Sequence, residues 1–140
     1  VNHYDSTRRR LYIFFELHKG GMSNRLLAAE IQKENKGNEL VVCDSAEPKS
    51  IAELQEYGIS AMGAKKGPDS VVYGMTWLQD LEEIVIDPKR CPMTAKEFTE
   101  YELESDGNGG WKAYFPDRND HAIDAVRYNR ERDMRPVRIW

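Results

Sequence analysis

Leu40-Val41-Val42-Cys43-Asp44-Ser45-Ala46-Glu47-Pro48 is the stretch of the sequence that decides the fold. Its first four residues are apolar without polar alternation, which predicts a strand buried on both faces in the interior of a sheet. The run ends abruptly at Asp44, and Pro48 suits the first position of a helix that lasts until Gly58. In open α/β sheets, sites form outside the carboxyl ends of the strands, where we expect Asp44. An aspartate that only caps a turn is an equal alternative.

The segments around this stretch predict alternating strands and helices. The expected strands are rich in apolar, aromatic or β-branched residues and cover residues 1–4, 11–17, 40–43, 59–64 and 83–87. The expected helices begin at a proline or a capping residue and span residues 24–35, 48–58, a stretch opening at 68, 94–101 and a stretch opening at 120. A glycine-rich turn at 105–110 predicts a late hairpin. Together these patterns predict an α/β fold with a central mixed β-sheet flanked by helices.

The stretch from Asn119 to Tyr128 predicts a helix with a polar side and an apolar side. Asn119 is a favourable N-cap, and at about 100° per residue Asp120, His121 and Asp124 share one arc. His121 and Asp124 are close enough along a helix to reach one ion or one water. Carboxylate and imidazole ligands suit Mn²⁺ or Mg²⁺ better than metals that prefer thiolate. Taken alone, an exposed polar helix face is the simpler interpretation.

Composition limits the class of protein. The chain has 140 residues, which is enough for one domain with a core. No apolar run approaches the roughly 18 residues that a membrane span needs. The net charge of −4 does not indicate broad nucleic-acid binding, although a metal site built from carboxylates is itself acidic. Cys43 and Cys91 lack metal-site spacing, so we expect buried free thiols in a reducing compartment. Val1 is not a start methionine, so we expect part of a longer chain.

The order of these segments resembles the nuclease domain of bacteriophage large terminase subunits, which has an RNase H-like fold. The resemblance covers most of the chain. It is carried by five pieces: Leu11-Tyr12-Ile13 with Glu16-Leu17; Gly21-Met22-Ser23-Asn24; Val41 to Ile51, with Asp44-Ser45-Ala46-Glu47 at its centre; Ala64-Lys65-Lys66-Gly67; and Asp120-His121-Ala122-Ile123-Asp124-Ala125-Val126-Arg127-Tyr128.

The resemblance implies a divalent-metal-dependent endonuclease that cuts concatemeric viral double-stranded DNA during genome packaging. It implies that Asp44, His121 and Asp124 are catalytic and hold two Mn²⁺ or Mg²⁺ ions, with Asp120 as an additional candidate ligand. We therefore expect these side chains to converge. The implied partners are viral DNA, the terminase ATPase domain, the portal and the small terminase subunit, in the host cytoplasm and without a membrane.

The loop Lys65-Lys66-Gly67 is a candidate for DNA contact. Lysine ammonium groups neutralise backbone phosphates, so Lys65 and Lys66 are expected to bind DNA. Solvated loop lysines are the alternative of about equal weight.

Two departures from the family matter. The family places another catalytic aspartate on a first strand, just before the strand where this chain begins, and Asp5 and Glu16 match other family positions. The ATPase motif G-x-x-x-x-G-K-[ST] is also absent, so the chain is not the motor. We therefore expect residues 1–140 to form a single, N-terminally incomplete nuclease domain. Another RNase H-like nuclease, such as a resolvase, and a catalytically impaired DNA-binding remnant are the alternatives.

Overall fold

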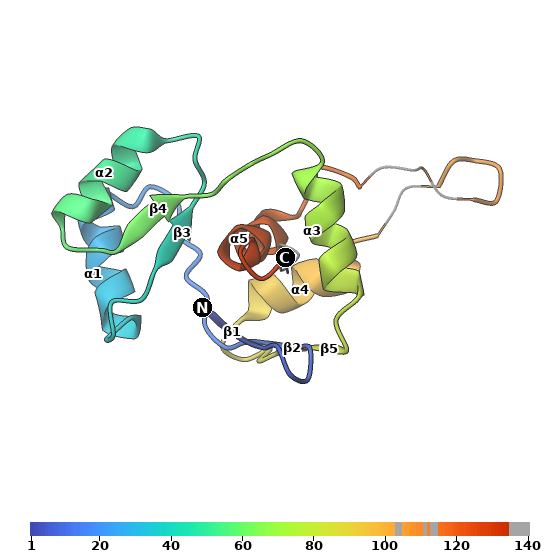
Figure 1. Cartoon of the computed structure of the whole chain (residues 1–140), viewed down its shortest axis with the longest axis horizontal. Helices are drawn as coiled ribbons and strands as arrows, with labels where there is room; N and C mark the ends of the chain where they lie inside the picture. Colours follow the sequence, from blue (N-terminus) through green and yellow to red (C-terminus); the bar gives the residue numbers. More distant parts are fainter. Residues whose placement is uncertain (103–104, 111, 113–114, 135–140) are drawn as a thin grey trace, which may run out of the picture.

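Strands and helices alternate along the chain in the order that the sequence predicts (Figure 1). The computed structural model describes residues 1–102, 105–110, 112 and 115–134. The strands are β1 (Asn2–Asp5), β2 (Arg10–Ile13), β3 (Val41–Cys43), β4 (Ala61–Gly63) and β5 (Glu83–Ile86). The helices are α1 (Asn24–Glu34), α2 (Pro48–Glu56), α3 (Ser70–Gln79), α4 (Pro92–Glu100) and α5 (His121–Arg130).

The strands form two sheets. In the first sheet, β2 pairs antiparallel with β1, with Tyr4 opposite Leu11, and parallel with β5, with Leu11 opposite Ile84. In the second sheet, β3 pairs parallel with β4, with Val41 opposite Ala61. The α/β class and the mixed sheet with flanking helices are confirmed.

One prediction about β3 is wrong. The apolar run forms a strand, but its residues are only half-buried, and β4 is the one described strand that pairs with it. A strand needs neighbours on both sides to be interior, and no described segment lies in register along the other edge of β3. Among the described residues, β3 is therefore an edge strand.

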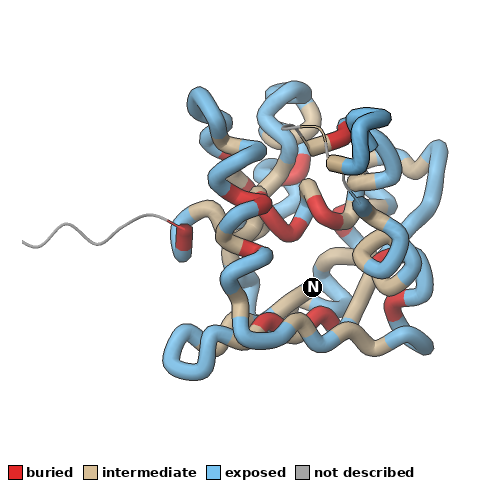
Figure 2. Tube along the Cα trace, turned by 90° about the vertical axis from the view of Figure 1, so that its right-hand side faces the viewer, coloured by how far each residue is buried: buried red, intermediate tan, exposed pale blue. Residues whose placement is uncertain are grey.

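Each sheet has its own hydrophobic core. The helices α3, α4 and α5 cover the three-stranded sheet, whereas α1 and α2 flank the β3–β4 pair (Figure 1). The larger core contains Leu11, Ile13, Met75, Leu78, Cys91, Ile123 and Val126. The smaller core contains Ala28, Leu54, Ile59 and Ala61. Figure 2 shows that the buried stretches lie towards the inside of the molecule. Because α5 belongs to the larger core and also contacts β3, this helix links the two halves.

Three helix starts differ from the predictions. α3 begins at Ser70, after Asp69, rather than at Pro68. At the other two, those of α4 and α5, a glutamate from another segment caps the helix. α4 begins at Pro92, before the expected cap Thr94, and the Glu16 carboxylate accepts the N–H groups of Met93 and Thr94 at 2.8 Å each. α5 begins at His121, after Asp120 rather than Asn119.

At α5, the Glu97 carboxylate accepts the Ile123 N–H at 2.9 Å. Distant carboxylates thus do what a local cap usually does.

The late hairpin is described only at its turn. The Asp106 carboxylate accepts the N–H groups of Asn108 at 2.7 Å and Gly110 at 3.1 Å. Gly107 and Gly109 take the left-handed conformation that such a turn requires. The expected flanking strands fall largely on residues 103–104, 111 and 113–114, which lie outside the described residues.

The two cysteines differ in burial. Both thiols are free; Cys91 is fully buried in the larger core, as expected, whereas Cys43 is only half-buried. Within the described residues, no helix has the length and apolar character to cross a membrane.

Candidate active site

Asp44 lies immediately after β3, at the carboxyl end of the strand. Its Oδ1 atom accepts the Ala46 N–H at 3.0 Å, so the carboxylate does cap the turn that follows the strand. The same atom accepts a hydrogen bond from the Lys66 ammonium at 2.5 Å, although both side chains are well exposed. The hydrogen bond from Lys66, with that from Ala46, holds the pKa of Asp44 below its ordinary value.

The loop between β4 and α3 faces the C-terminal part of α5. Pairing with Asp44 raises the pKa of Lys66, whose Nζ atom also lies 5.1 Å from the centre of the Tyr128 ring. The Lys65 backbone N–H donates to both carboxylate oxygens of Glu131, at 3.1 Å and 2.9 Å. The loop is therefore fixed to the segment that carries Asp124.

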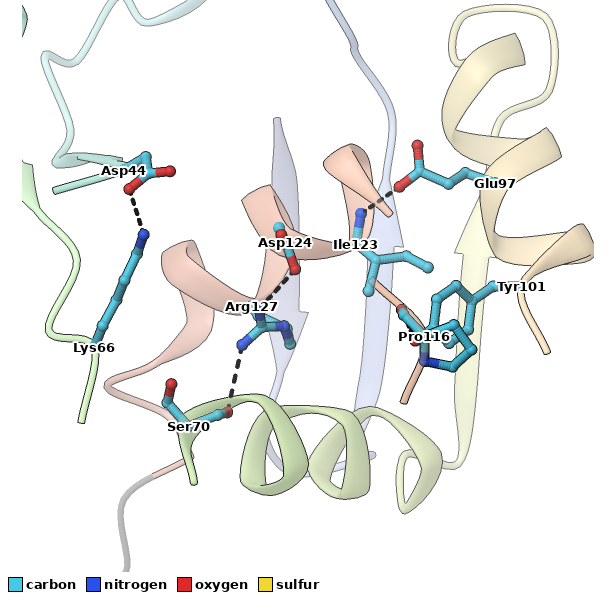
Figure 3. A network of polar contacts seen from close by, with 9 residues as sticks. All are labelled: Asp44, Lys66, Ser70, Glu97, Tyr101, Pro116, Ile123, Asp124 and Arg127. Carbon is cyan, nitrogen blue, oxygen red and sulfur yellow. Dashed lines mark hydrogen bonds and ion pairs between the residues drawn. The ribbon is translucent and has the colours of Figure 1, made fainter. Parts of the chain in front are cut away.

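Asp124 lies on α5 and pairs with a buried cation. The Nη2 atom of Arg127 lies 2.6 Å from Asp124 Oδ1, and the Arg127 side chain is only 6% exposed. The Nη1 atom of Arg127 donates to the Ser70 carbonyl at the start of α3, at 3.3 Å (Figure 3). Arg127 therefore connects the Asp124 carboxylate on α5 to the first residue of α3.

His121 and Asp120 lie at the start of α5. His121 is the exposed first residue of the helix, and Asp120 is half-buried. Burial raises the pKa of Asp120, and the negative charges of Asp124 and Asp117 raise it further. Burial likewise raises the pKa of Glu97, although the N–H groups of the first helical turn oppose the shift. This end of the helix is therefore rich in carboxylates.

The described residues do not form a ready-made metal site. No three His, Cys, Asp or Glu side chains in the described part of the chain lie close enough to hold one ion. The cations of Lys66 and Arg127 instead neutralise Asp44 and Asp124, as Figure 3 shows. Carboxylates and an imidazole are suitable ligands for Mn²⁺ or Mg²⁺, but too few of them are gathered here. The metal roles of Asp44, His121, Asp124 and Asp120 remain predictions.

A pocket lined by charges of both signs lies beside these residues. It has a volume of about 470 Å³ and lies between the β4–α3 loop and α5. Its lining includes the cations Lys65, Lys66 and Arg127, the carboxylates Asp69 and Glu131, and the aromatic rings of Tyr73 and Tyr128. Cationic and aromatic side chains together are able to bind the phosphates and bases of nucleic acid.

Two important residues were not predicted from the sequence. Arg127 follows Asp124 by three residues and lies at the border between the polar and the apolar arc, next to Ile123, so a charged residue beside an apolar arc was the available signal. Glu97 had no such signal, because its contact with Ile123 joins two helices that are distant in sequence. Asp5 and Glu16, which match other family positions, each make structural contacts of their own. Asp5 accepts the N–H groups of Thr7 and Arg8, and Glu16 caps α4.

Comparison with known proteins shows which family this chain belongs to. The family model described as "Terminase RNAseH like domain" matches residues 4–131. The chain belongs to this terminase family. The terminase large subunit of Bacillus phage SPP1 is 42% identical over 99% of this chain and 34% of its own length. The PBSX phage terminase large subunit of Bacillus subtilis (strain 168) is 30% identical over 75% of this chain and 24% of its own length. This terminase domain thus spans about a third or less of these relatives.

Solved structures agree with the family. The crystal structure of the g2p (large terminase) nuclease domain from bacteriophage SPP1 with bound Mn matches with a TM-score of 0.86 and 42% identity. The match covers 94% of this chain and 76% of that chain. The large terminase of a thermophilic bacteriophage has a TM-score of 0.62 over 86% of this chain and 32% of that chain. At 23% identity, the second match supports the fold alone. The RNase H-like fold of this terminase domain is confirmed, and the resolvase alternative is not supported.

Proposed function

We propose that this chain is the metal-dependent endonuclease domain of a phage large terminase, which cuts concatemeric viral double-stranded DNA during packaging. The observation that carries the proposal is the similarity to the Mn-bound SPP1 nuclease domain over 94% of the chain. In this proposal, residues 1–140 belong to a single nuclease domain.

Asp44, His121 and Asp124 are the proposed catalytic and metal-binding residues, with Asp120 as an additional ligand. If these residues held two divalent ions, Mn²⁺ or Mg²⁺, the ions would supply a nucleophilic hydroxide and would stabilise charge on the attacking and leaving oxygens. The described residues gather too few ligands, so the proposal requires a further carboxylate. A strand upstream of Val1 is its proposed source, because the family resemblance places an aspartate there.

Lys65 and Lys66 are the proposed DNA contacts. Both line the pocket between the β4–α3 loop and α5, and the Lys66 ammonium pairs with Asp44, so a backbone phosphate bound there would lie near the proposed ligands. Lys66 has to exchange its ion pair with Asp44 for a phosphate, and the exposure of both partners favours this exchange.

The proposed partners follow from the same family. They are viral double-stranded DNA, the terminase ATPase domain, the portal and the small terminase subunit. Packaging takes place in the host cytoplasm, so we propose that location for a phage or prophage protein.

Plasmid cleavage across a Mn²⁺ titration tests the function. The 140-residue chain should cleave poorly, because it lacks the further carboxylate. In the chain extended upstream by the proposed strand, we expect double-strand cleavage with little sequence preference, and Asp44→Ala and Asp124→Ala should each abolish it. His121→Ala should only weaken cleavage, because an imidazole brings no negative charge to the ions. Asp80→Ala is the matched control, because Asp80 is an exposed aspartate at the end of α3. Cleavage that persists in Asp44→Ala would mean that the proposed site is wrong.

A catalytically impaired DNA-binding module is the second candidate. It is favoured by the finding that the described residues do not gather three metal ligands. Such a module retards DNA in a gel-shift assay but leaves plasmid intact at every Mn²⁺ concentration. Plasmid cleavage across the Mn²⁺ titration therefore distinguishes the nuclease from the impaired DNA-binding module.

A further inference from the structure

The loop between β4 and α3 depends on polar contacts for its position. Residues 64–69 connect the smaller sheet to a helix that covers the larger one (Figure 1). Ala64, at the start of the loop, continues the strand pairing, because its N–H donates to the Cys43 carbonyl at 2.8 Å. Residues 65–69 are all exposed, so packing contributes little to where they lie. Hydrogen bonds therefore have to hold this part of the loop.

Glu131 supplies such a contact. Its carboxylate accepts the Lys65 backbone N–H at 3.1 Å on Oε1 and at 2.9 Å on Oε2. Glu131 is the C-cap residue of α5. A negative charge is unfavourable there, because the helix dipole already places partial negative charge at the carboxyl end of a helix. A carboxylate at this position calls for an explanation, and its bond to the loop gives one.

The segment that carries Glu131 is itself held on two sides. The Arg130 Nε atom donates to the side-chain oxygen of Asn2 on β1 at 2.7 Å. The Tyr73 hydroxyl on α3 donates to the Met134 carbonyl at 2.5 Å. Because β1 and α3 both belong to the half with the larger sheet, Glu131 ties the loop to a firm support.

The same helix also meets the side chain of Lys66. Tyr128 lies three residues before Glu131, so the two side chains are neighbours along α5. The Lys66 Nζ atom lies 5.1 Å from the centre of the Tyr128 ring, within the range of a cation–π contact, and 2.5 Å from Asp44 Oδ1. The Lys66 ammonium can reach these two partners only while the loop backbone beside it is held in place.

We infer that Glu131 is a positioning residue for DNA binding, because its carboxylate holds the loop that presents the Lys66 ammonium to a backbone phosphate. The inference rests on the proposed DNA contact of Lys66. It gives an acidic side chain a role that favours binding of an anion, and it does not require a bound metal ion. Glu131 does not itself touch DNA in this role.

Affinity for a short DNA duplex, measured by fluorescence anisotropy on the 140-residue chain in EDTA, tests the inference. By charge alone, removal of a carboxylate should strengthen DNA binding. We expect Glu131→Ala to weaken it about fivefold instead, because the loop loses a hydrogen bond to a charged group. Glu131→Gln keeps one acceptor oxygen and should recover part of this loss. The two variants carry the same charge, so the difference between them reports the hydrogen bond.

Asp69→Asn is the matched control. Asp69 is an exposed carboxylate that lines the same pocket, and its side chain makes no hydrogen bond that caps α3. Asparagine tolerates the left-handed backbone at this position, where φ is 59°. This variant removes the same charge without removing the contact to the loop, so it should bind DNA at least as tightly as the unmutated chain.

Amide hydrogen exchange, followed by NMR without DNA, tests the contact itself. The Lys65 N–H should exchange about tenfold faster in Glu131→Ala than in the unmutated chain. The Ala64 N–H, whose acceptor is the Cys43 carbonyl, should keep its protection and so show that the fold persists. Unchanged exchange at Lys65 would overturn the inference.

Lys66→Met separates the inference from the proposed DNA contact. The double variant with Glu131→Ala should bind DNA no more weakly than Lys66→Met, because Glu131 acts through Lys66. Losses that multiply would overturn the positioning role alone, and so would unchanged or tighter DNA binding in Glu131→Ala while Lys66→Met binds weakly. Normal DNA binding in Lys66→Met, or no DNA binding by the unmutated chain, would overturn the proposed DNA contact and the positioning role with it.

Discussion

At the residue scale, two aspartates of the same proposed site are neutralised in different ways. Asp44 pairs with an exposed lysine on a loop, whereas Asp124 pairs with a buried arginine on its own helix. Exposed ion pairs contribute about 0–1 kcal/mol, so the contact of Asp44 breaks easily. A buried pair cannot lose one partner without leaving an uncompensated charge. We therefore expect Lys66 to move during function and Arg127 to stay.

This contrast predicts a gain of metal affinity. Lys66→Met removes the cation that competes with Mn²⁺ for Asp44, so Mn²⁺ should bind up to about fivefold more tightly. DNA binding should weaken, because a proposed phosphate contact is lost. Calorimetry for Mn²⁺ and gel shift for DNA measure the two effects separately.

Lys65→Met is the control for this prediction. Lys65 precedes Lys66 in the loop, and its contact with Glu131 uses the backbone N–H rather than the ammonium. Its replacement should leave Mn²⁺ affinity unchanged. If Lys66→Met bound Mn²⁺ no better than the unmutated chain, Lys66 would not compete for Asp44.

The sequence predicted that acidic side chains stand at the ends of a strand and a helix, but it did not predict which cations pair with them. Asp44 follows an apolar strand, and that position was readable from the local pattern. The pairing with Lys66 depends on how a loop packs against β3, and such packing leaves no local signal. Arg127 is the instructive failure, since its place next to Ile123, at the border of the apolar arc, was visible but a buried guanidinium was not expected.

At the scale of elements, helix bodies were predictable and some helix starts were not. α1 matches its expected range within one residue because Ser23, its cap, is adjacent in sequence. The starts of α4 and α5 depend on Glu16 and Glu97, which come from other segments. Local sequence cannot show that a distant carboxylate completes a cap.

The cap on α4 predicts a pH-dependent stability. Partial burial raises the pKa of Glu16, but hydrogen bonds from the Thr94 hydroxyl and from the Met93 and Thr94 N–H groups outweigh it and lower the pKa below 4.5. A lowered pKa in the folded state means that the carboxylate stabilises the fold above pH 4.5, and that this contribution is lost as the pH falls through the folded-state pKa. Glu16→Gln should therefore cost about 1 kcal/mol of unfolding free energy at pH 7 and much less at low pH.

Urea unfolding at pH 7 and at a series of acidic values measures this effect. Glu56→Gln, at an exposed glutamate at the end of α2, is the control and should change stability little at any pH. An equal cost of Glu16→Gln at pH 7 and at low pH would show that the charge of Glu16 does not stabilise α4.

At the scale of the whole molecule, the division into two sheets is the main departure from the predicted fold. Each strand and helix was predictable, because its signal lies within a few residues. The pairing of strands was not, because β2 pairs with β5 across α1, β3, α2, β4 and α3. In the described chain, β1, β3, β4 and β5 each pair with a single neighbour and so each leave an edge without a described partner. Unpaired edges of this kind are templates for a further strand.

The proposed upstream strand therefore has a structural and a chemical consequence. If it pairs with β1 and β3, it joins the two sheets, and the melting temperature should rise by about 4 °C or more. The family resemblance also implies a further catalytic aspartate on this strand. An added carboxylate supplies the ligand that the described residues lack, so Mn²⁺-dependent cleavage of plasmid DNA should rise sharply.

Comparison of three polypeptides separates these two consequences. They are the 140-residue chain, the chain extended upstream by the strand, and the extended chain with asparagine in place of the strand's aspartate. We expect both extended chains to be more stable, because the strand pairs through its backbone, whereas only the aspartate form should cleave efficiently, because asparagine brings no negative charge to the ions. Cleavage by the 140-residue chain that equals that of the extended chain would show that Asp44, His121 and Asp124 suffice without the additional carboxylate. Greater stability without greater cleavage in the aspartate form would assign the strand to the fold alone and place the missing ligand elsewhere.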